Sequence, residues 1–307
     1  MDPRAQIAEA HAVGRAVTIG RIEQVRAQAL VQVRRSMGMT RQPPAPCLDP
    51  ELAYIDPDSV VRRIHGDLPA MLIGGLSALL FQMLHPLAMA GVAQHSNYRS
   101  DPLGRLERTA TFLGTTTFGT VPEARAAIER VRRVHGHVRG VASDGRPYSA
   151  TDPDLLTWVH VAEVSSFLAA SRAYAPSPPT PADADDYLDQ MAEVALDLGA
   201  ADVPRSTAEL DAYVASVRPR LRFTPEARDA RNFVLRGVGR WPHEVATYSL
   251  LVGAAQGVLP PWARRQLRLP SLPAGDLLAV RPSARLLGSA FRWVVTPVEA
   301  TPATAGR

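Results

Sequence analysis

Two neighbouring histidines, His135 and His137, are of a residue type that can bind a metal ion, and helical spacing separates them. Residues 123–140 have the period of an amphipathic helix, whose apolar side consists of Ala124, Ile128, Val131 and Val138, with Ala127 and Val134 alongside. His135 falls on that side, and His137 falls about 200° away, among arginines. A buried imidazole needs a hydrogen-bond partner or a metal ion. Spacing alone favours a core histidine bonded to a carbonyl, and metal binding stays open.

Arg105 and Thr109 form a second group, because residues four apart share one face of a helix. Phe112 lies on the same face, so the predicted surface is partly apolar. A guanidinium held beside a hydroxyl suits an anionic group such as a carboxylate or a propionate. The alternative is structural: the arginine pairs with a carboxylate of the core, and the threonine bonds to its own helix. Taken alone, the pair fits this alternative better.

The remaining histidines and the cysteine narrow the chemistry. His85, His95 and His160 lie in apolar stretches, but no HExxH, GxSxG or GxGxxG motif occurs, so a conventional hydrolase is not predicted. Cys47 is single, which excludes a disulfide, a cysteine zinc site or an iron–sulfur cluster within one chain. All 34 basic residues are arginine, which excludes Schiff-base chemistry. Histidines, arginines and apolar helices together favour a haem.

Composition and charge exclude other classes of protein. The 307 residues are 46% hydrophobic and 21% charged, which is typical of a folded globular chain. The net charge of +4 is not gathered into a basic stripe with aromatics, so no nucleic-acid partner is predicted. Residues 68–84 carry no charge but contain proline and glycine, and they are predicted to form a helix buried on all sides rather than a membrane span. Asp2 and Glu9 argue against a secretory signal, so a soluble, cytoplasmic protein is expected.

Helical spacing and turn residues predict an all-α fold. The predicted helices cover residues 4–37, 58–84, 101–118, 123–140, 153–174, 183–200, 206–218, 225–237 and 243–257. The one strand pairing that the pattern allows is a short one near residues 146–150. The predicted organisation is an N-terminal helical arm (1–50), a helical core (51–270) and a C-terminal extension (271–307) whose tail is disordered beyond about residue 296.

Several motifs occur together in a familiar order. They are LLFQMLHPLAMAGVAQHSNYRSDPLGRLERTATFLGTTTFG, VHGHVRG, GRPYSATDPDLLTWVH, FTPEAR and GVLPPWAR. Over residues 55–270 the set resembles the family of latex-clearing proteins and fungal MpaB oxygenases, also called the rubber oxygenase catalytic domain. The resemblance implies a single globin-like helical domain with extra N- and C-terminal helices that holds a non-covalent haem b. The best-known members cleave isoprenoid C=C bonds with O2.

The resemblance also assigns roles to residues of this chain. His135, the first histidine of VHGHVRG, matches the proximal iron ligand, and Arg105 and Thr109 match the haem-pocket pattern RxxxT, which implies cofactor-binding and catalytic roles. Two positions depart from the family. Latex-clearing proteins can place a lysine next to that threonine, where this chain has Arg108, which cannot bind iron. They also use a carboxylate from the preceding helix, but residues 68–100 contain no Asp or Glu. Both departures argue against polyisoprene as the substrate.

We therefore expect a haem b-dependent oxidoreductase of the oxygenase, oxidase or peroxygenase type. It would act on an apolar or aromatic small molecule with O2 or peroxide, and His135 would bind the iron while its other ring nitrogen donates to a carbonyl or carboxylate. Two alternatives stay open: a haem-binding sensor or carrier without turnover, and a haem-free helical scaffold. A visible absorption spectrum separates the last from the other two.

Overall fold

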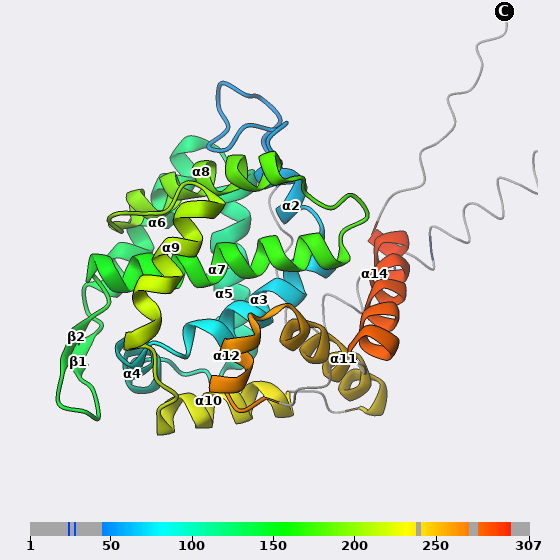
Figure 1. The fold of residues 1–307 in the computed structure, drawn as a ribbon. Helices are drawn as coiled ribbons and strands as arrows, with labels where there is room; N and C mark the ends of the chain where they lie inside the picture. The colour runs from blue at the N-terminus through cyan, green and yellow to red at the C-terminus, as the bar shows by residue number, and fades with distance from the viewer. Residues whose placement is uncertain (1–23, 25–27, 29–44, 238–240, 270–275, 296–307) are drawn as a thin grey trace, which may run out of the picture.

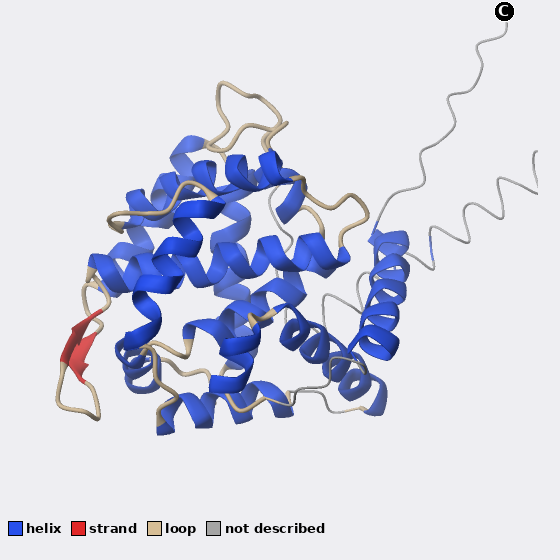
Figure 2. Cartoon of the chain, viewed as in Figure 1, coloured by secondary structure: helices blue, strands red, loops and turns tan. Residues whose placement is uncertain are grey.

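The computed structural model describes residues 24, 28, 45–237, 241–269 and 276–295, and nearly all of its elements are helices (Figures 1 and 2). The α-helices are α2 (Val60–His65), α3 (Leu68–Gln82), α4 (Pro86–His95), α5 (Pro102–Phe118), α6 (Val121–His135), α7 (Pro153–Tyr174), α8 (Pro181–Leu198), α9 (Thr207–Val217), α10 (Pro225–Arg236), α11 (Pro242–Val258), α12 (Pro261–Gln266) and α14 (Arg281–Val295). In the described part of the chain the strands are β1 (Arg139–Val141) and β2 (Pro147–Ser149), which form an antiparallel pair. The helical fold class is confirmed, and a globin-like arrangement stays a prediction.

Half of the described α-helices begin where the sequence places a capping side chain before a proline. Asp152 accepts a hydrogen bond from the amide of Asp154, and Pro153 then supplies the first helical residue of α7. Asp101 caps α5 in the same way through the amide of Gly104. The predicted starts of these two helices are confirmed for this reason. The predicted helix 58–84 is instead divided at Gly66 and Asp67 into α2 and α3, and α4, α12 and α14 were not predicted.

The centre of the fold is the antiparallel pair of α3 and α7, which cross the middle of the molecule (Figure 1). Gly74 allows the close approach, since a Cβ atom there would lie 2.6 Å from Cδ1 of Phe167. Nearer the other end, the rings of Phe81 and Trp158 meet edge to face at 5.1 Å. The prediction of a core helix at 68–84 is confirmed for one face, but burial on all sides was wrong, because Leu72 keeps accessible surface.

In the described ranges, no single helix is both long and apolar enough to cross a membrane. The pair of α3 and α4 passes the same test of length and composition only when the two helices are joined, and they are bent by 106° at the break between them.

The last described helix, α14, contacts the start of α3 and the end of α7 through Arg292. Arg292 forms two hydrogen bonds of 2.8 Å with the carboxylate of Asp67, directly before α3, and a third of 2.9 Å with the carbonyl of Tyr174, the last residue of α7. This ion pair is mostly buried, at 20% and 10% side-chain exposure, and the bidentate geometry is the strong form of such pairs. The predicted N-terminal helix 4–37 lies outside the described residues except for residues 24 and 28, which are helical.

Helices α5 and α6 form an antiparallel hairpin around Gly119 and Thr120. Thr120 and Glu123 make a reciprocal capping box that starts α6. The predicted end of α6 near residue 140 was wrong: Gly136 caps the helix after His135, and residues 139–141 pair with 147–149 as strands. The predicted pairing near 146–150 is confirmed by the same register.

Candidate functional site

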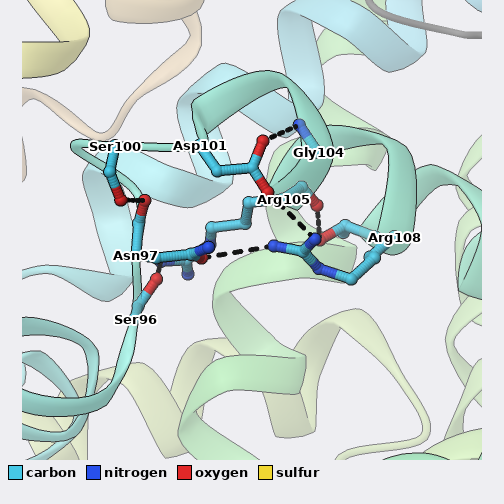
Figure 3. A network of polar contacts seen from close by, with 8 residues as sticks. Ser96, Asn97, Ser100, Asp101, Gly104, Arg105 and Arg108 are labelled. Carbon is cyan, nitrogen blue, oxygen red and sulfur yellow. Dashed lines mark hydrogen bonds and ion pairs between the residues drawn. The ribbon is translucent and has the colours of Figure 1, made fainter.

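Arg105 lies in the first turns of α5 with its guanidinium turned inward. Its Nη1 donates a 2.6 Å hydrogen bond to Oγ of Ser96, the residue that caps the end of α4 (Figure 3). Burial, and then the charge of Arg108, lower the pKa of Arg105. In the described ranges no carboxylate pairs with it, so the structural alternative of a core ion pair is not observed. A mostly buried cation without a counter-ion can receive an anionic ligand.

Thr109 and Arg108 face outward. The hydroxyl of Thr109 donates to the carbonyl of Arg105 at 3.1 Å, so the bond to its own helix is present, as the structural alternative predicts. The guanidinium of Arg108 donates to Asp101 at 3.1 Å and to Asn97 at 3.3 Å (Figure 3). Both side chains are exposed. Of the two residues in the RxxxT pattern, Arg105 is therefore the one whose polar group is held inside.

His135 is the last residue of α6, and its half-buried side chain has no hydrogen bond to any described residue. Its Nδ1 is fully buried and unpartnered, so the predicted donation to a carbonyl or carboxylate is not observed. Burial lowers the pKa of His135, so the imidazole is neutral at pH 7 and keeps a lone pair. A neutral imidazole with no protein partner can serve as a metal ligand, which keeps that interpretation open.

His137 is exposed, as predicted, but for a different reason. It lies beyond the end of α6, so the helical angle that separated it from His135 does not apply to it. Its Nδ1 contacts the carbonyl of Arg133 at 2.7 Å. Val134, placed beside the apolar side of the predicted helix, is 58% exposed, so that part of the pattern was wrong. His135 is the histidine of this pair that is turned toward the protein.

The α5–α6 hairpin brings Arg105 and His135 to the same end of the fold. Both lie about 21 to 23 Å from the turn at Gly119, because the two helices rise at about 1.5 Å per residue from it. α4 connects them: Ser96 binds Arg105, and Gly91 approaches Val138, three residues after His135. We call this the open end of α5.

The other end of α5 is closed around His65. Its Nδ1 lies 2.7 Å from the hydroxyl of Thr117 and its Nε2 lies 3.0 Å from the hydroxyl of Tyr187, so both ring nitrogens are satisfied. The ring also meets Phe167 of α7 edge to face at 5.4 Å. Burial lowers the pKa of His65 to about 3, so it stays neutral. This contact fixes α5, α2, α7 and α8 against one another.

Exposure along α5 increases away from this contact. Leu106, Ala110, Leu113 and Thr117 share one face of the helix. Thr117 is 1% exposed, Leu113 and Ala110 are half-buried, and Leu106 is 37% exposed. Leu113 packs against the core cluster that contains Val161, Val164 and Phe167 of α7, so the face becomes accessible only toward the open end of α5.

Two titratable residues of α7, His160 and Glu163, lie on the helix face that carries Phe167. Burial raises the pKa of Glu163 to about 7 and lowers the pKa of His160 to about 4. Nε2 of His160 is fully buried and has no partner among the described residues. Glu163 was not predicted, although a lone acid within the apolar stretch WVHVAEV was a visible signal.

The other candidate histidines have structural partners. His85 begins α4, where its Nδ1 accepts a long hydrogen bond of 3.5 Å from the amide of Ala88, and burial lowers its pKa to about 4. His95 contacts the hydroxyl of Tyr148 at 3.1 Å near the β-hairpin. Ser165 bonds to the carbonyl of Val161 in its own helix at 2.6 Å. Of these hydrogen bonds, the one of His95 joins two elements, α4 and β2, whereas the other two are local to α4 and α7.

Comparison with known proteins gives one result. The family model described as "ER-bound oxygenase mpaB/B'/Rubber oxygenase, catalytic domain" matches residues 62–293, which include α3 to α12 and most of α14. Neither the curated proteins nor the solved structures contain a match to the chain.

Proposed function

Because this chain belongs to the family of ER-bound mpaB oxygenases and rubber oxygenase catalytic domains, an oxidoreductase activity is implied, and we propose that it depends on haem b bound through His135. The observation that carries the proposal is the state of His135: a neutral, half-buried imidazole that ends α6 and has no partner in the described part of the chain. A haem iron needs only one protein ligand of this kind.

The ligand types around the site fit a haem better than a metal ion held by side chains alone. In the described ranges no three His, Cys, Asp or Glu side chains gather into a metal-binding group. Arg105 supports the same proposal, because its buried guanidinium lacks a carboxylate and lies at the same end of the hairpin as His135. In this arrangement His135 holds the iron, and Arg105 receives a propionate.

A bound haem supplies O2 or peroxide chemistry, and the protein determines what reaches it. Leu106 and Ala110 make the accessible part of this face of α5 apolar, which suits an apolar or aromatic small molecule. Thr109 stays a proposed contact at the open end of α5, where its hydroxyl is exposed and bonded to its own helix. We propose a small-molecule substrate, no nucleic-acid partner and a cytoplasmic location.

One observation favours a second candidate, a haem-binding sensor or carrier. Arg108 occupies the position of the lysine found in latex-clearing proteins, and its guanidinium is paired with Asp101 at the surface. The side chain at this position, turned to the surface, would then not contact oxygen bound at a haem. The carboxyl of Glu163, whose pKa burial raises to about 7, favours the enzyme, because a carrier needs no such group.

A pyridine haemochrome assay on protein produced with adequate haem supply tests the proposal. We expect extractable haem b in stoichiometric amount, since the chain has no CxxCH attachment motif. Colourless protein after haem supply and direct reconstitution would overturn it. Protein that binds haem but leaves O2, peroxide and aromatic test substrates unchanged would support the carrier instead.

A further inference from the structure

Arg62 of α2 is a buried cation that the proposed function does not use. The residue is 6% exposed, and its Nε and Nη2 are fully buried without a hydrogen-bond partner. Its Nη1 donates a hydrogen bond of 2.5 Å to the carbonyl of Cys47. No ion pair within the described ranges includes Arg62. A buried guanidinium without a counter-charge is strongly unfavourable, so these atoms point to an anionic ligand.

The two unpartnered nitrogens form the edge of the guanidinium that holds carboxylates elsewhere in this protein. Nε and Nη2 of Arg292 each donate a hydrogen bond of 2.8 Å to one oxygen of Asp67. The same two nitrogens of Arg146 donate to the carboxylate of Asp144 at 2.9 and 2.7 Å. Their N–H bonds point in the same direction, at a spacing that matches the two oxygens of a carboxylate. In Arg62 this edge is buried, and no protein oxygen accepts from it.

Residues 47–53 connect Arg62 to the turn of the α5–α6 hairpin. The amide of Cys47 donates to the carbonyl of Phe118 at 2.7 Å, and the carbonyl of Leu52 accepts from the amide of Val121 at 2.9 Å. The guanidinium lies over the ring of Phe118, with Cζ 5.7 Å from the ring centroid. Cys47 is half-buried and Leu52 is 55% exposed. The segment therefore borders on solvent, and a small molecule can reach Arg62 where this segment moves aside.

The surroundings of Arg62 are separate from the two sites described above. The guanidinium contacts Cys47 and Phe118, whereas the ring of His65 contacts the neighbouring helices α5, α7 and α8. Phe118 and Arg105 are thirteen residues apart, so about 20 Å of α5 separates Arg62 from the open end. A haem bound at the open end would therefore leave the unpartnered nitrogens of Arg62 unchanged.

We propose that Arg62 binds a small carboxylate between α2 and residues 47–53. Nε and Nη2 each donate a hydrogen bond to one carboxylate oxygen, in the geometry that Arg292 shows with Asp67. The negative charge neutralises the buried guanidinium, and both nitrogens gain a partner. Nη1 keeps the carbonyl of Cys47, so the bound acid also fixes residues 47–53 against α2. The inference does not depend on haem.

The contacts of the guanidinium favour a carboxylate over a phosphate. The described groups that meet it are the carbonyl of Cys47, which is an acceptor, and the ring of Phe118, which is apolar. A tetrahedral oxyanion brings two further oxygens, and neither of these groups can donate to them. The methyl group of acetate or the C–H of formate meets the aromatic ring without that cost. A small monocarboxylate therefore satisfies the donors and leaves no buried acceptor without a partner.

Thermal unfolding of the full chain in acetate, chloride and phosphate at equal ionic strength tests the proposal. The protein is first dialysed exhaustively against chloride at pH 7. A dissociation constant of about 3 mM would raise the melting temperature by roughly 3 °C at about 50 mM acetate for a chain of this length. We expect this rise in acetate and a smaller one in phosphate, each measured relative to chloride.

Three variants assign the effect to Arg62. Arg62→Met removes the guanidinium, and Arg62→Lys keeps a positive charge but not the paired donors, so both should lose the response to acetate. Arg63→Met is the matched control on the same helix, because it removes an exposed arginine paired with Asp183, and it should keep the full response. Acetate bound at a haem iron would act equally in all three variants, since each retains His135.

The same response to acetate in wild type and Arg62→Lys would overturn the proposal, and so would a larger response to phosphate than to acetate. A carboxylate held too tightly for dialysis would instead appear in the proton NMR spectrum of the supernatant after acid precipitation. It should be present for wild type and Arg63→Met and absent for Arg62→Met. No response in wild type together with no acid in the supernatant would also overturn the proposal.

Discussion

The two ends of α5 contain similar residue types in opposite states. At the closed end, the ring of His65 has a hydroxyl within 3.0 Å of each nitrogen, and Thr117 is 1% exposed. At the open end, His135 has no partner in the described part of the chain, and Arg105 has a single hydrogen bond to a neutral hydroxyl. One end satisfies its polar groups internally, whereas the other leaves them for a ligand.

The difference shows how one helix can serve stability and binding together. The closed end fixes α5 to α2, α7 and α8 through contacts that need nothing from outside. At the open end, the contacts with α6 support α5. Unsatisfied buried groups are unfavourable, and they persist where the rest of the structure holds them in place.

The largest expected effect is on haem retention at the open end. His135→Ala should reduce bound haem from near stoichiometric to near zero, because no covalent bond holds the cofactor and the iron ligand is lost. The measurement is the pyridine haemochrome content after purification. His137→Ala, two positions away and exposed, is the control and should keep its haem. Equal loss in both variants would mean that the ligand assignment is wrong.

The next effect concerns the buried carboxyl of Glu163 and depends on pH. Its pKa is about 7 in the folded protein and about 4.5 in the unfolded chain, so the unfolded state releases its proton first as pH rises. The contribution of Glu163 to the free energy of unfolding is therefore fully present below about pH 4.5 and is lost as pH rises toward 7. Glu163→Gln should raise the free energy of unfolding by roughly 3 kcal/mol at pH 8 and by almost nothing at pH 4.

Denaturant unfolding at the two pH values measures this change. Glu129→Gln, which removes an exposed carboxylate from α6, should show no such dependence. A pH-independent effect of Glu163→Gln would mean that the carboxyl is solvated rather than buried.

A smaller effect is expected at the closed end. His65→Leu should lower the free energy of unfolding by about 2 kcal/mol at pH 7, because it leaves the hydroxyls of Thr117 and Tyr187 buried without their partner. Burial lowers the pKa of His65 to about 3, so in the wild type its contribution is present above about pH 6.5 and is lost as pH falls toward 3. Haem content should not change, and loss of haem in this variant would show that the two ends are coupled.

The smallest effect is expected for Arg105. Arg105→Met removes the buried cation but keeps much of the apolar side chain, and it should weaken haem affinity about tenfold, or about 1.4 kcal/mol. The measurement is the rate of haem transfer to a competing haem-binding protein. Arg108→Met, in which the lost guanidinium is exposed, should change the rate by less than about twofold.

Elements with local signals could be predicted from the sequence, and those set by tertiary contacts could not. The start of α7 follows from Asp152 and Pro153, which lie next to each other in the chain. The end of α6 at His135 depends on the pairing of residues 139–141 with 147–149, which a helical pattern does not contain. α4 was missed because its bounds, Pro86 and His95, lie in an apolar stretch without a regular period.

The candidate site, too, could be predicted from the sequence only in part. His135 was placed on the inner side of α6 by spacing, and the structure agrees that it is half-buried. Whether its nitrogens find partners depends on residues far away in the chain, and the predicted acceptor for Nδ1 is not observed. Glu163 was overlooked because a single acid in an apolar helix is usually solvated, and only the packing of α7 shows that it is enclosed.

The ion pair of Arg292 with Asp67, together with its hydrogen bond to the carbonyl of Tyr174, also sets an order of events during synthesis. Asp67 and Arg292 are separated by 225 positions, so the carboxylate leaves the ribosome long before its partner exists. Until α14 emerges, the paired ends of α3 and α7 carry a buried acid without a counter-charge and a carbonyl without its donor. Contacts of such long range form late and slowly. The nascent chain should therefore remain open to chaperones until residues 281–295 have been added, and only then become resistant to proteases.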